Sequence, residues 1–308
     1  MEVFKGFSAL GRELSRSVVT VGNFDGVHLG HREIIQLAIQ KARKLGGASV
    51  VYTFRPHPRV ALRPDLPFRF LNTYDEKIEL IRSLGPDLLI EEPFSREFST
   101  MSAEQFFGDV VVKALHAEAL VVGHDFGFGR SREGHLDTLT RFCNQTSLDL
   151  TIVSPFKVGE EVVSSSKIRA HLDAGQLEAA NALLGYRFGY RGLVIKGDGR
   201  GRTIGFPTCN LSVEPKLDLP FGVYATWATL ADGKKLRGAT NIGVRPTFEG
   251  AKGVQIETHL LDFWGDLYGQ QVELQFVDKV RDEKKFGSID ELKSQIAFDI
   301  ERIRQVLT

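Results

Sequence analysis

Apolar positions in the first half of the chain follow two alternating spacings. Short apolar runs rich in β-branched residues have the length of buried strands, at residues 18–21, 48–54, 87–90, 119–122 and 148–153. Between them, residues 30–45, 75–84 and 103–115 place apolar side chains three and four positions apart, which predicts helices. Strands that alternate with helices predict a doubly wound α/β fold, in which helices cover both faces of a parallel sheet.

The second half is richer in strands. Two short helices are predicted at residues 167–172 and 176–184, and Gly185 ends the second, so we expect domains at 1–185 and 186–308. The predicted strands beyond that boundary are residues 222–230, 235–242, 254–261 and 272–277. The first two flank Asp232-Gly233, a hairpin signal, because the glycine supplies the positive φ of a tight turn. This pattern is typical of a small antiparallel β-barrel.

The chain ends in a predicted long helix. Ser288 is the expected N-cap, and Glu291 three positions later would complete a capping box. The expected buried stripe of this helix is Ile289, Leu292, Ile296, Ile300 and Ile303.

Composition narrows the class of protein further. The 308 residues include 39 Lys plus Arg and 39 Asp plus Glu, so no net charge favours nucleic acid or an anionic membrane as a partner. Cys143 and Cys209 are far apart and form no CxxC pair, which favours a reducing compartment. With no apolar run resembling a signal peptide or a membrane span, we expect a cytoplasmic protein. The sequence leaves self-association open.

The turn from strand to helix at residues 21–31 is the clearest chemical signal of the first half. Ligands bind at the carboxyl ends of strands in open α/β sheets, and a helix N-terminus offers unpaired N–H groups to phosphate. His28 and His31 both fall near that terminus and can donate hydrogen bonds to phosphate oxygens, while Gly30 allows an adenine ring to approach. The predicted phosphate site consists of Gly22, Phe24, Asp25, His28, Gly30 and His31.

Two other interpretations of the histidine pair stay open. His28 and His31 could ligate a metal ion, although the helix that follows offers no third ligand at helical spacing. They could also cap or pack the helix and do no chemistry.

Four segments together resemble a known family. The turn at 21–31 is similar to the nucleotidylyltransferase superfamily, whose fold is Rossmann-like. Residues 122–130 resemble the Gly-x-Asp-Phe-x-Phe-Gly motif of bacterial FAD synthetases, residues 164–169 resemble their Ser-Ser-x-x-Ile-Arg motif, and residues 53–58 match a further segment. That family commonly has Asp where this chain has Arg55.

The resemblance implies roles for residues outside the turn. Ser165 and Ser166, at a predicted helix start, would bind ATP, and Arg169 would neutralise the departing pyrophosphate; taken alone, they could be an N-cap with an exposed arginine. The residues implied in flavin binding are His57, Asp125, Phe126 and Phe128. The two phenylalanines could equally be core residues, Asp125 could only brace its loop, and Pro56-His57-Pro58 could be a simple turn.

A glycine-rich loop opens the second half. It lacks the ending of a Walker loop and no helix is predicted after it, so it suits a mobile cover for phosphates, or else a plain flexible loop. It resembles the riboflavin kinase module of bacterial FAD synthetases, with Cys209 in place of the usual Ala. The implied ATP-binding residues are Gly197, Gly199, Gly201, Arg202, Gly205, Phe206 and Pro207. Thr208 and Asn210 would contact Mg²⁺, for which hydroxyl and amide oxygens are suitable ligands.

The same resemblance places the general base of the kinase on Glu257. Gln255, Glu257 and His259 share one face of a predicted strand, and periodicity alone allows that face to be merely solvated. Arg281 falls where the family closes its flavin site, although a surface role fits too. Residues 241–248 and 266–269 match further family segments.

The resemblance therefore implies a bifunctional enzyme of flavin cofactor synthesis. The second half would phosphorylate riboflavin to FMN with ATP and Mg²⁺, and the first half would adenylylate FMN to FAD and release pyrophosphate. The alternatives are a chain with one working half, an adenylyltransferase for another substrate, and a flavin or nucleotide sensor without activity. Motifs in both halves, with His28, His31, Thr208 and Glu257 intact, disfavour all three.

Overall fold

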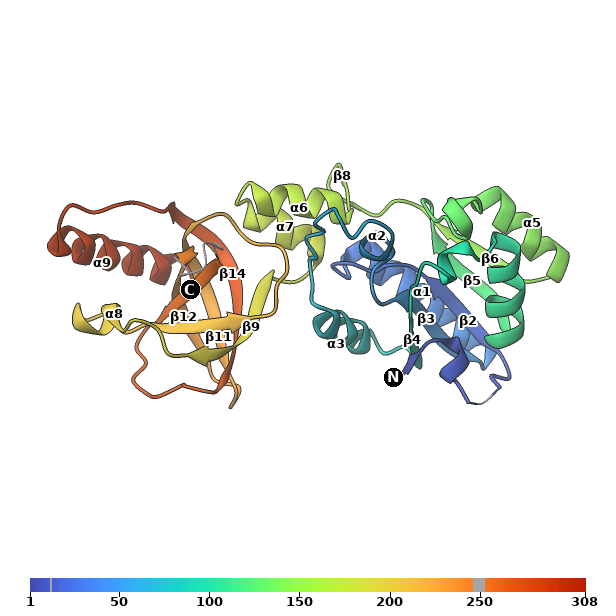
Figure 1. Ribbon diagram of the computed structural model, residues 1–308, viewed down its shortest axis with the longest axis horizontal. Helices are drawn as coiled ribbons and strands as arrows, with labels where there is room; N and C mark the ends of the chain where they lie inside the picture. The colour runs from blue at the N-terminus through green and yellow to red at the C-terminus, as the bar shows by residue number, and fades with distance from the viewer. Residues whose placement is uncertain (12, 246–252) are drawn as a thin grey trace. The chain divides into compact units, whose positions relative to one another are not determined.

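The computed structural model describes residues 1–11, 13–245 and 253–308, which form two compact units, Met1–Ser165 and Ser166–Thr308 (Figure 1). Each unit has its own core and is described by itself. Of the family segment at 241–248, Pro246, Thr247 and Phe248 lie outside the described residues.

The first unit is built on a sheet of six parallel strands in the order β1-β4-β3-β2-β5-β6. Its strands are β1 (Glu2–Lys5), β2 (Ser17–Val21), β3 (Ala48–Phe54), β4 (Leu88–Glu92), β5 (Ala117–Gly123) and β6 (Asp149–Val153). All five predicted strands are present, and the edge strand β1 was not predicted because its four residues are mostly exposed.

Helices cover both faces of this sheet, which confirms the doubly wound fold. They are α1 (Leu29–Leu45), α2 (Pro58–Leu62), α3 (Tyr74–Leu84), α4 (Ala103–Gln105), the π-helix η3 (Phe106–Ala114) and α5 (Leu136–Thr146), with 3₁₀ turns η1 (Phe7–Ala9), η2 (Phe98–Thr100) and η4 (Arg130–Arg132). Strand β3 shows the two layers, since Val51 packs with Ile39 of α1 and Ile81 of α3, whereas Val50 packs on the side of Phe107. Helix α5 was missed, because only Leu139 and Cys143 of it are buried.

The strand order of the sheet reverses beside β2. Helix α1 follows β2 and leads to β3 on one side, and the chain reaches β5 on the other side only after β4. In such folds the crevice outside the carboxyl ends of the strands, at the point where the order reverses, is the preferred ligand site. The residues after β2, β3 and β5 therefore share this edge.

The first unit closes with the short pair β7 (Lys157–Val158) and β8 (Glu161–Val162) and with Ser165, the first residue of helix α6 (Ser165–Asp173). The second unit holds the rest of α6 and continues with α7 (Leu177–Leu184). Helix α7 is bonded to the barrel, because Asn181 donates to the Phe276 carbonyl at 3.0 Å and accepts from the Phe188 N–H at 2.7 Å. The compact units thus divide before residue 185, and the predicted boundary between functional modules stays a prediction.

A closed barrel of six antiparallel strands forms the body of the second unit, which confirms the predicted architecture. Around the barrel the strands are β10 (Cys209–Val213), β13 (Gly253–Leu260), β12 (Lys235–Arg245), β11 (Gly222–Leu230), β14 (Gln271–Asp282) and β9 (Gly189–Ile195), and a short helix α8 (Arg200–Thr203) precedes β10. The hydroxyls of Thr226, Thr240 and Thr258 form a buried ladder at 2.7 and 2.9 Å, so these buried polar groups satisfy one another.

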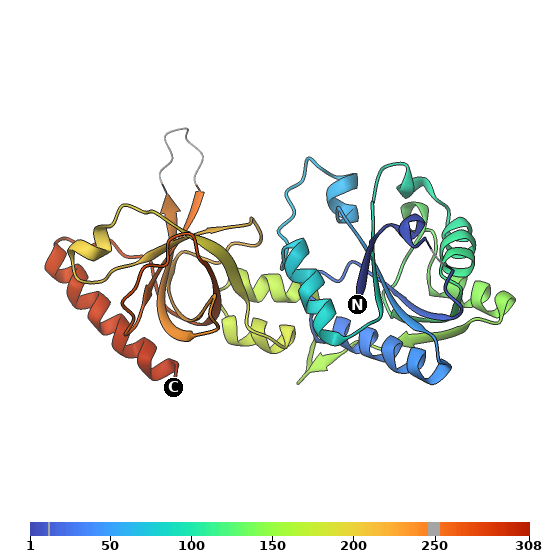
Figure 2. The same cartoon turned by 90° about the horizontal axis from the view of Figure 1, so that it is seen from below.

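The terminal helix α9 (Ile289–Val306) lies against the outside of the barrel (Figure 2). Ser288 caps it by accepting from the Glu291 N–H at 3.2 Å, but Glu291 accepts from the Gly287 N–H, so only half of the predicted capping box forms. The predicted stripe is correct at its C-terminal end, where Ile303 is buried. It is wrong at Ile289, which is 62% exposed at the first turn of the helix.

Candidate active sites

Two stacked histidines mark the start of α1. The rings of His28 and His31 lie 3.5 Å apart between centroids, at an interplanar angle of 16°. His28 is the N-cap, and its Nδ1 accepts from the His31 N–H at 3.3 Å, so a neutral His28 ring carries its proton on Nε2. The capping interpretation of His28 is therefore correct in part, and the cap also fixes the ring beside the helix terminus.

The ring of His31 is shielded from solvent. The Nδ1 atom of His31 is buried and has no hydrogen-bond partner among the described residues. Burial, with the nearby charges of His28 and Lys77, lowers the pKa of His31 well below its usual value. A neutral imidazole is thus the stable form of His31 in the folded chain.

The turn between β2 and α1 is rigid. Phe24 is buried against the edge of the His31 ring at 5.3 Å, and its φ is 50°. Asp25 is buried too, and its Oδ1 accepts from the Leu71 N–H at 3.0 Å. Gly22 packs so closely that a Cβ there would lie 3.0 Å from the Phe24 ring. These contacts hold the histidine pair on a defined backbone.

The start of α6 reaches the same turn. The Ser165 hydroxyl donates to the Asp25 carbonyl at 2.9 Å, which fixes the first residue of α6 beside the turn. Ser166 follows it, and Arg169 is one helical turn further on.

The segment after β3 forms an aromatic corner. His57 stacks on Phe68 at 4.5 Å, and its N–H donates to the Tyr74 hydroxyl at 2.9 Å. Arg55 lies over the Tyr74 ring at 4.7 Å and forms ion pairs with Asp75 at 3.8 Å and Glu91 at 3.7 Å. At the position where the family commonly has Asp, the charge of Arg55 is thus offset by two carboxylates.

A buried lysine that the motifs did not reveal lies at the same edge. Lys77 of α3 is 5% exposed, and its Nζ donates to the Thr53 hydroxyl at 3.2 Å and lies 3.5 Å from the Asn23 carbonyl. Burial lowers its pKa to about 8, against the opposing effect of Glu91 and Asp25. The sequence does contain a sign that Lys77 is buried: it stands four positions before Ile81, on the apolar stripe of a predicted helix.

The loop after β5 holds two stacked phenylalanines. Phe126 and Phe128 are 5.4 Å apart at 15°, but Phe128 is buried in the core of the unit and only Phe126 is half-buried. The Asp125 side chain is exposed, and its carbonyl accepts from Arg132 at 3.0 Å. The core interpretation therefore fits Phe128 better than Phe126.

The glycine-rich loop of the barrel contains the short helix α8 and several close approaches. A Cβ at Gly201 would lie 2.3 Å from the Phe206 carbonyl oxygen, and one at Gly197 would lie 2.1 Å from Asn210 Nδ2. Gly199 and Gly205 have φ of 70° and 93°. His259 anchors the end of the loop through a 2.7 Å hydrogen bond between its Nδ1 and the Pro207 carbonyl. Arg202 is exposed.

Three polar side chains meet on one face of the barrel wall. Asn210 pairs directly with Glu257 across β10 and β13. Gln255 Nε2 lies 2.8 Å from Asn210 Oδ1 and 2.9 Å from Glu257 Oε1. Strand alternation places Gln255 on the face of Glu257, so this shared face was predictable, whereas the two hydrogen bonds were not.

Arg281 is engaged within its own unit. Its Nε bonds Asp299 of α9 at 2.8 Å, and its guanidinium lies over the Phe286 ring at 5.6 Å. Asp299 is 3% exposed, so this ion pair ties β14 to α9.

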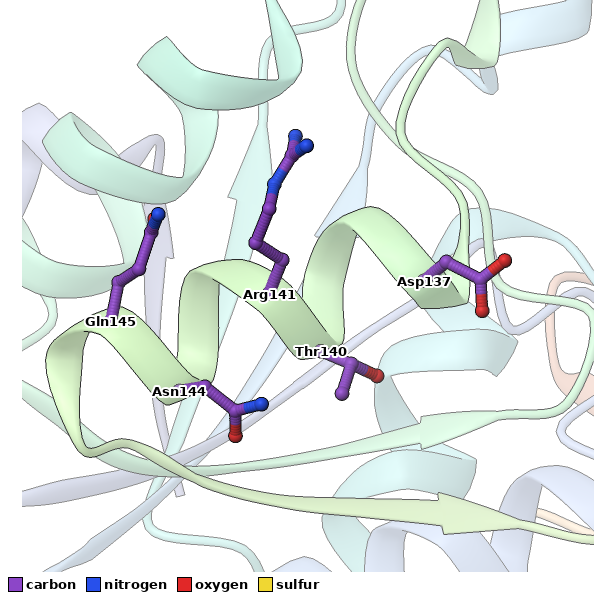
Figure 3. Close-up of a pocket in the computed structure, with 5 residues that line it drawn as sticks. All are labelled: Asp137, Thr140, Arg141, Asn144 and Gln145. Atoms are coloured by element: carbon purple, nitrogen blue, oxygen red, sulfur yellow. The ribbon is translucent and has the colours of Figure 1, made fainter.

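None of these residues lines the hollow shown in Figure 3, which is an open face of helix α5 alone: Asp137, Thr140, Arg141, Asn144 and Gln145. In the described part of the chain, no three His, Cys, Asp or Glu side chains are grouped to hold a metal ion. No described helix has the length and hydropathy needed to cross a membrane.

Comparison with known proteins finds a family match for each half of the chain. The FAD synthetase family model matches residues 11–167, and the riboflavin kinase family model matches residues 184–307. The fold and these two matches define a two-module enzyme of flavin nucleotide synthesis. The chain is 37% identical to the bifunctional riboflavin kinase/FMN adenylyltransferase of Escherichia coli K12, covering 97% of this chain and 96% of that one. It belongs to the bifunctional riboflavin kinase/FMN adenylyltransferase family and is an enzyme with both activities.

Two further relatives support the full-length match. The bifunctional enzyme of Listeria monocytogenes is 37% identical over 92% of this chain and 90% of its own. A crystal structure from Streptococcus pneumoniae, named a macrolide-efflux protein, superimposes with a TM-score of 0.88 at 32% identity and covers 98% of both chains.

Proposed function

We propose that adenylyl transfer takes place at the N-terminus of α1, on the stacked pair His28 and His31. The observation that carries this proposal is the pair itself, held at the carboxyl edge of the sheet where the strand order reverses. A neutral His31 donates a hydrogen bond without adding a charge that water must solvate. The proposed ATP-binding residues around the pair are Gly22, Phe24, Asp25, Gly30, Ser165 and Ser166.

The chemistry at this site needs positioning more than proton transfer. The FMN phosphate is ionised near neutral pH, so it attacks the α-phosphorus of ATP without a general base, and pyrophosphate leaves. Histidine N–H groups and the helix terminus stabilise the charge that develops on the phosphoryl oxygens. Arg169 neutralises the leaving pyrophosphate.

We place the flavin of this reaction against the aromatic corner after β3. His57 already stacks on Phe68, and Phe126 is half-buried on the loop after β5, so both offer planar faces to an isoalloxazine ring. Asp125, exposed after β5, is the proposed polar contact, and Phe128 supports Phe126 from the core.

Riboflavin phosphorylation is assigned to the barrel. Glu257 removes the proton of the ribityl 5′-hydroxyl, which is needed because an alcohol is a poor nucleophile. The loop residues Gly197, Gly199, Gly201, Arg202, Gly205, Phe206 and Pro207 cover the phosphates of ATP. Arg281 acts at the edge of the flavin site through its place between Asp299 and Phe286.

Thr208 and Asn210 fit a magnesium ion. Both offer neutral oxygen ligands, Asn210 is 8% exposed with a fixed amide, and Mg²⁺ takes the rest of its ligands from water and substrate phosphates. When bound, the ion would offset negative charge on the transferred phosphoryl group. We further propose functional modules at 1–185 and 186–308 and a cytoplasmic location, supported by two free cysteines.

One assay tests these assignments together. The full chain is incubated with riboflavin, ATP and Mg²⁺, and the flavins are separated over time. Formation of FMN followed by FAD supports both sites, whereas FMN alone indicates a kinase whose first half has no adenylyltransferase activity. No product at all would support a sensor. Omission of Mg²⁺ should stop FMN formation if Thr208 and Asn210 hold the ion.

A further inference from the structure

Gln255 is joined to both polar residues of the proposed kinase site. An amide NH₂ group has two protons, and Gln255 Nε2 has two acceptors within 2.9 Å, Asn210 Oδ1 and Glu257 Oε1. Both protons are therefore used, one on each residue. The three side chains come from adjacent strands β10 and β13, which lie in direct register at Asn210 and Glu257.

The Gln255 donor sets the orientation of the Asn210 amide, and Gly197 leaves the room that the amide needs. Its Nδ2 faces Gly197, where an added Cβ would lie only 2.1 Å away, so the NH₂ end occupies space that glycine leaves open. Its Oδ1 faces the Gln255 donor. Rotating the amide by half a turn would place Asn210 Nδ2 against Gln255 Nε2, two donors facing each other, which costs a hydrogen bond in a largely buried place.

We propose that Gln255 is a positioning residue of the kinase site, which sets the amide orientation of Asn210 and the carboxylate orientation of Glu257 with one NH₂ group. This inference rests on the proposed roles of Asn210 and Glu257. It couples the Mg²⁺ ligand to the general base, so that both oxygens face the same point on the barrel wall. Groups that orient ligands in this way commonly change metal affinity or activity about 10- to 100-fold when removed.

The barrel contains a matched control. Gln275 donates its Nε2 to Glu273 Oε1 at 3.2 Å, the same contact between positions two apart on one strand face, but on β14 and away from Asn210. Gln255→Met and Gln275→Met both remove an amide and keep the length of the side chain. A difference in kinase activity between the two variants is therefore due to the position of Gln255 beside Asn210 and Glu257, and not to the loss of an amide from a strand face.

The test uses the full chain with each substitution. Gln255→Met should lower the kcat of riboflavin phosphorylation about tenfold or more with little change in the KM for riboflavin, and should weaken the Mg²⁺-dependent part of ADP binding measured by calorimetry. FMN adenylylation and the melting temperature should match the unmodified chain. Gln275→Met should leave all five quantities unchanged. Equal kinase turnover in the two variants, or an unchanged Mg²⁺ effect on ADP binding, overturns the proposal.

Two further variants, Gln255→Glu and Glu257→Gln, allow the proposal to be tested even if Gln255→Met does not fold. Gln255→Glu keeps the shape but removes both donors, so it replaces Gln255→Met if that protein does not fold. Glu257→Gln, assayed in parallel, separates the proposed role of Glu257 as the base from the proposed role of Gln255 in positioning. If Glu257→Gln keeps kinase activity, the proposed base is wrong. If Glu257→Gln loses kinase activity while Gln255→Met keeps all of it, only the positioning role is wrong. In the Glu257→Gln background, Gln255→Met should have much less effect on turnover, because it acts in part through Glu257.

Discussion

The imidazoles of His28 and His31 lie face to face, 3.5 Å apart at the first turn of α1, and the backbone N–H of one bonds the ring of the other. This arrangement holds two rings at the positive end of a helix dipole, where phosphate is favoured. Since His31 is neutral in the folded chain, the pair avoids the repulsion of two stacked cations.

His28→Ala should lower the rate of FMN adenylylation on the order of a hundredfold, because it removes a donor to a developing charge and the cap that orients His31. Riboflavin phosphorylation should be unchanged, since the barrel does not depend on this residue. Flavin product analysis with FMN or riboflavin as substrate measures the two steps separately. Loss of kinase activity in the variant would contradict independent sites.

Gly30→Ala tests whether ATP packs closely against this glycine. A Cβ there would lie 3.5 Å from the His28 ring and 3.6 Å from Phe156, which is ordinary contact, and alanine favours a helix by up to about 1 kcal/mol. The melting temperature should therefore stay the same or rise, while FMN adenylylation should fall about tenfold or more because ATP loses its close approach. Full adenylylation in a stable variant would mean that no substrate packs against Gly30.

Glu257→Gln should reduce riboflavin phosphorylation on the order of a hundredfold or more, because the amide cannot accept the proton of the ribityl hydroxyl. FMN supplied directly should still be converted to FAD at the normal rate. Steady-state rates with each flavin check both statements. Near-normal phosphorylation would leave Glu257 as a structural residue of the barrel wall.

Lys77 should give the stability of the chain a specific pH dependence. Its pKa is about 8 in the folded chain and 10.5 in the reference state, so the unfolded chain holds the extra proton between these values. The contribution of Lys77 to the free energy of unfolding therefore rises with pH across that window, by up to about 3 kcal/mol.

The comparison with Lys77→Met isolates this effect. Between about pH 7 and about pH 10, the difference in unfolding free energy should shift in favour of the unmodified chain, as denaturant titration of both proteins would reveal. A difference that is the same at both pH values would mean that Lys77 does not titrate in this range.

Local pattern was enough for much of the fold. Residues 48–54 form strand β3 as predicted, since a short apolar run with β-branched side chains between turns is typical of a sheet interior. Among the elements that were missed, β1 is four residues long and mostly exposed, and α5 buries only Leu139 and Cys143.

The sequence by itself determined which side chains stand next to one another along the chain: the histidine pair after β2, the glycine-rich loop, and the shared face of Gln255 and Glu257. Contacts between distant segments were decided only by the tertiary structure, which brought Lys77 of α3 to the end of β3 and set Asn210 beside Gln255. Motifs encode spacing along one element, whereas the partners of a buried polar group depend on which strands become neighbours when the sheet and the barrel close.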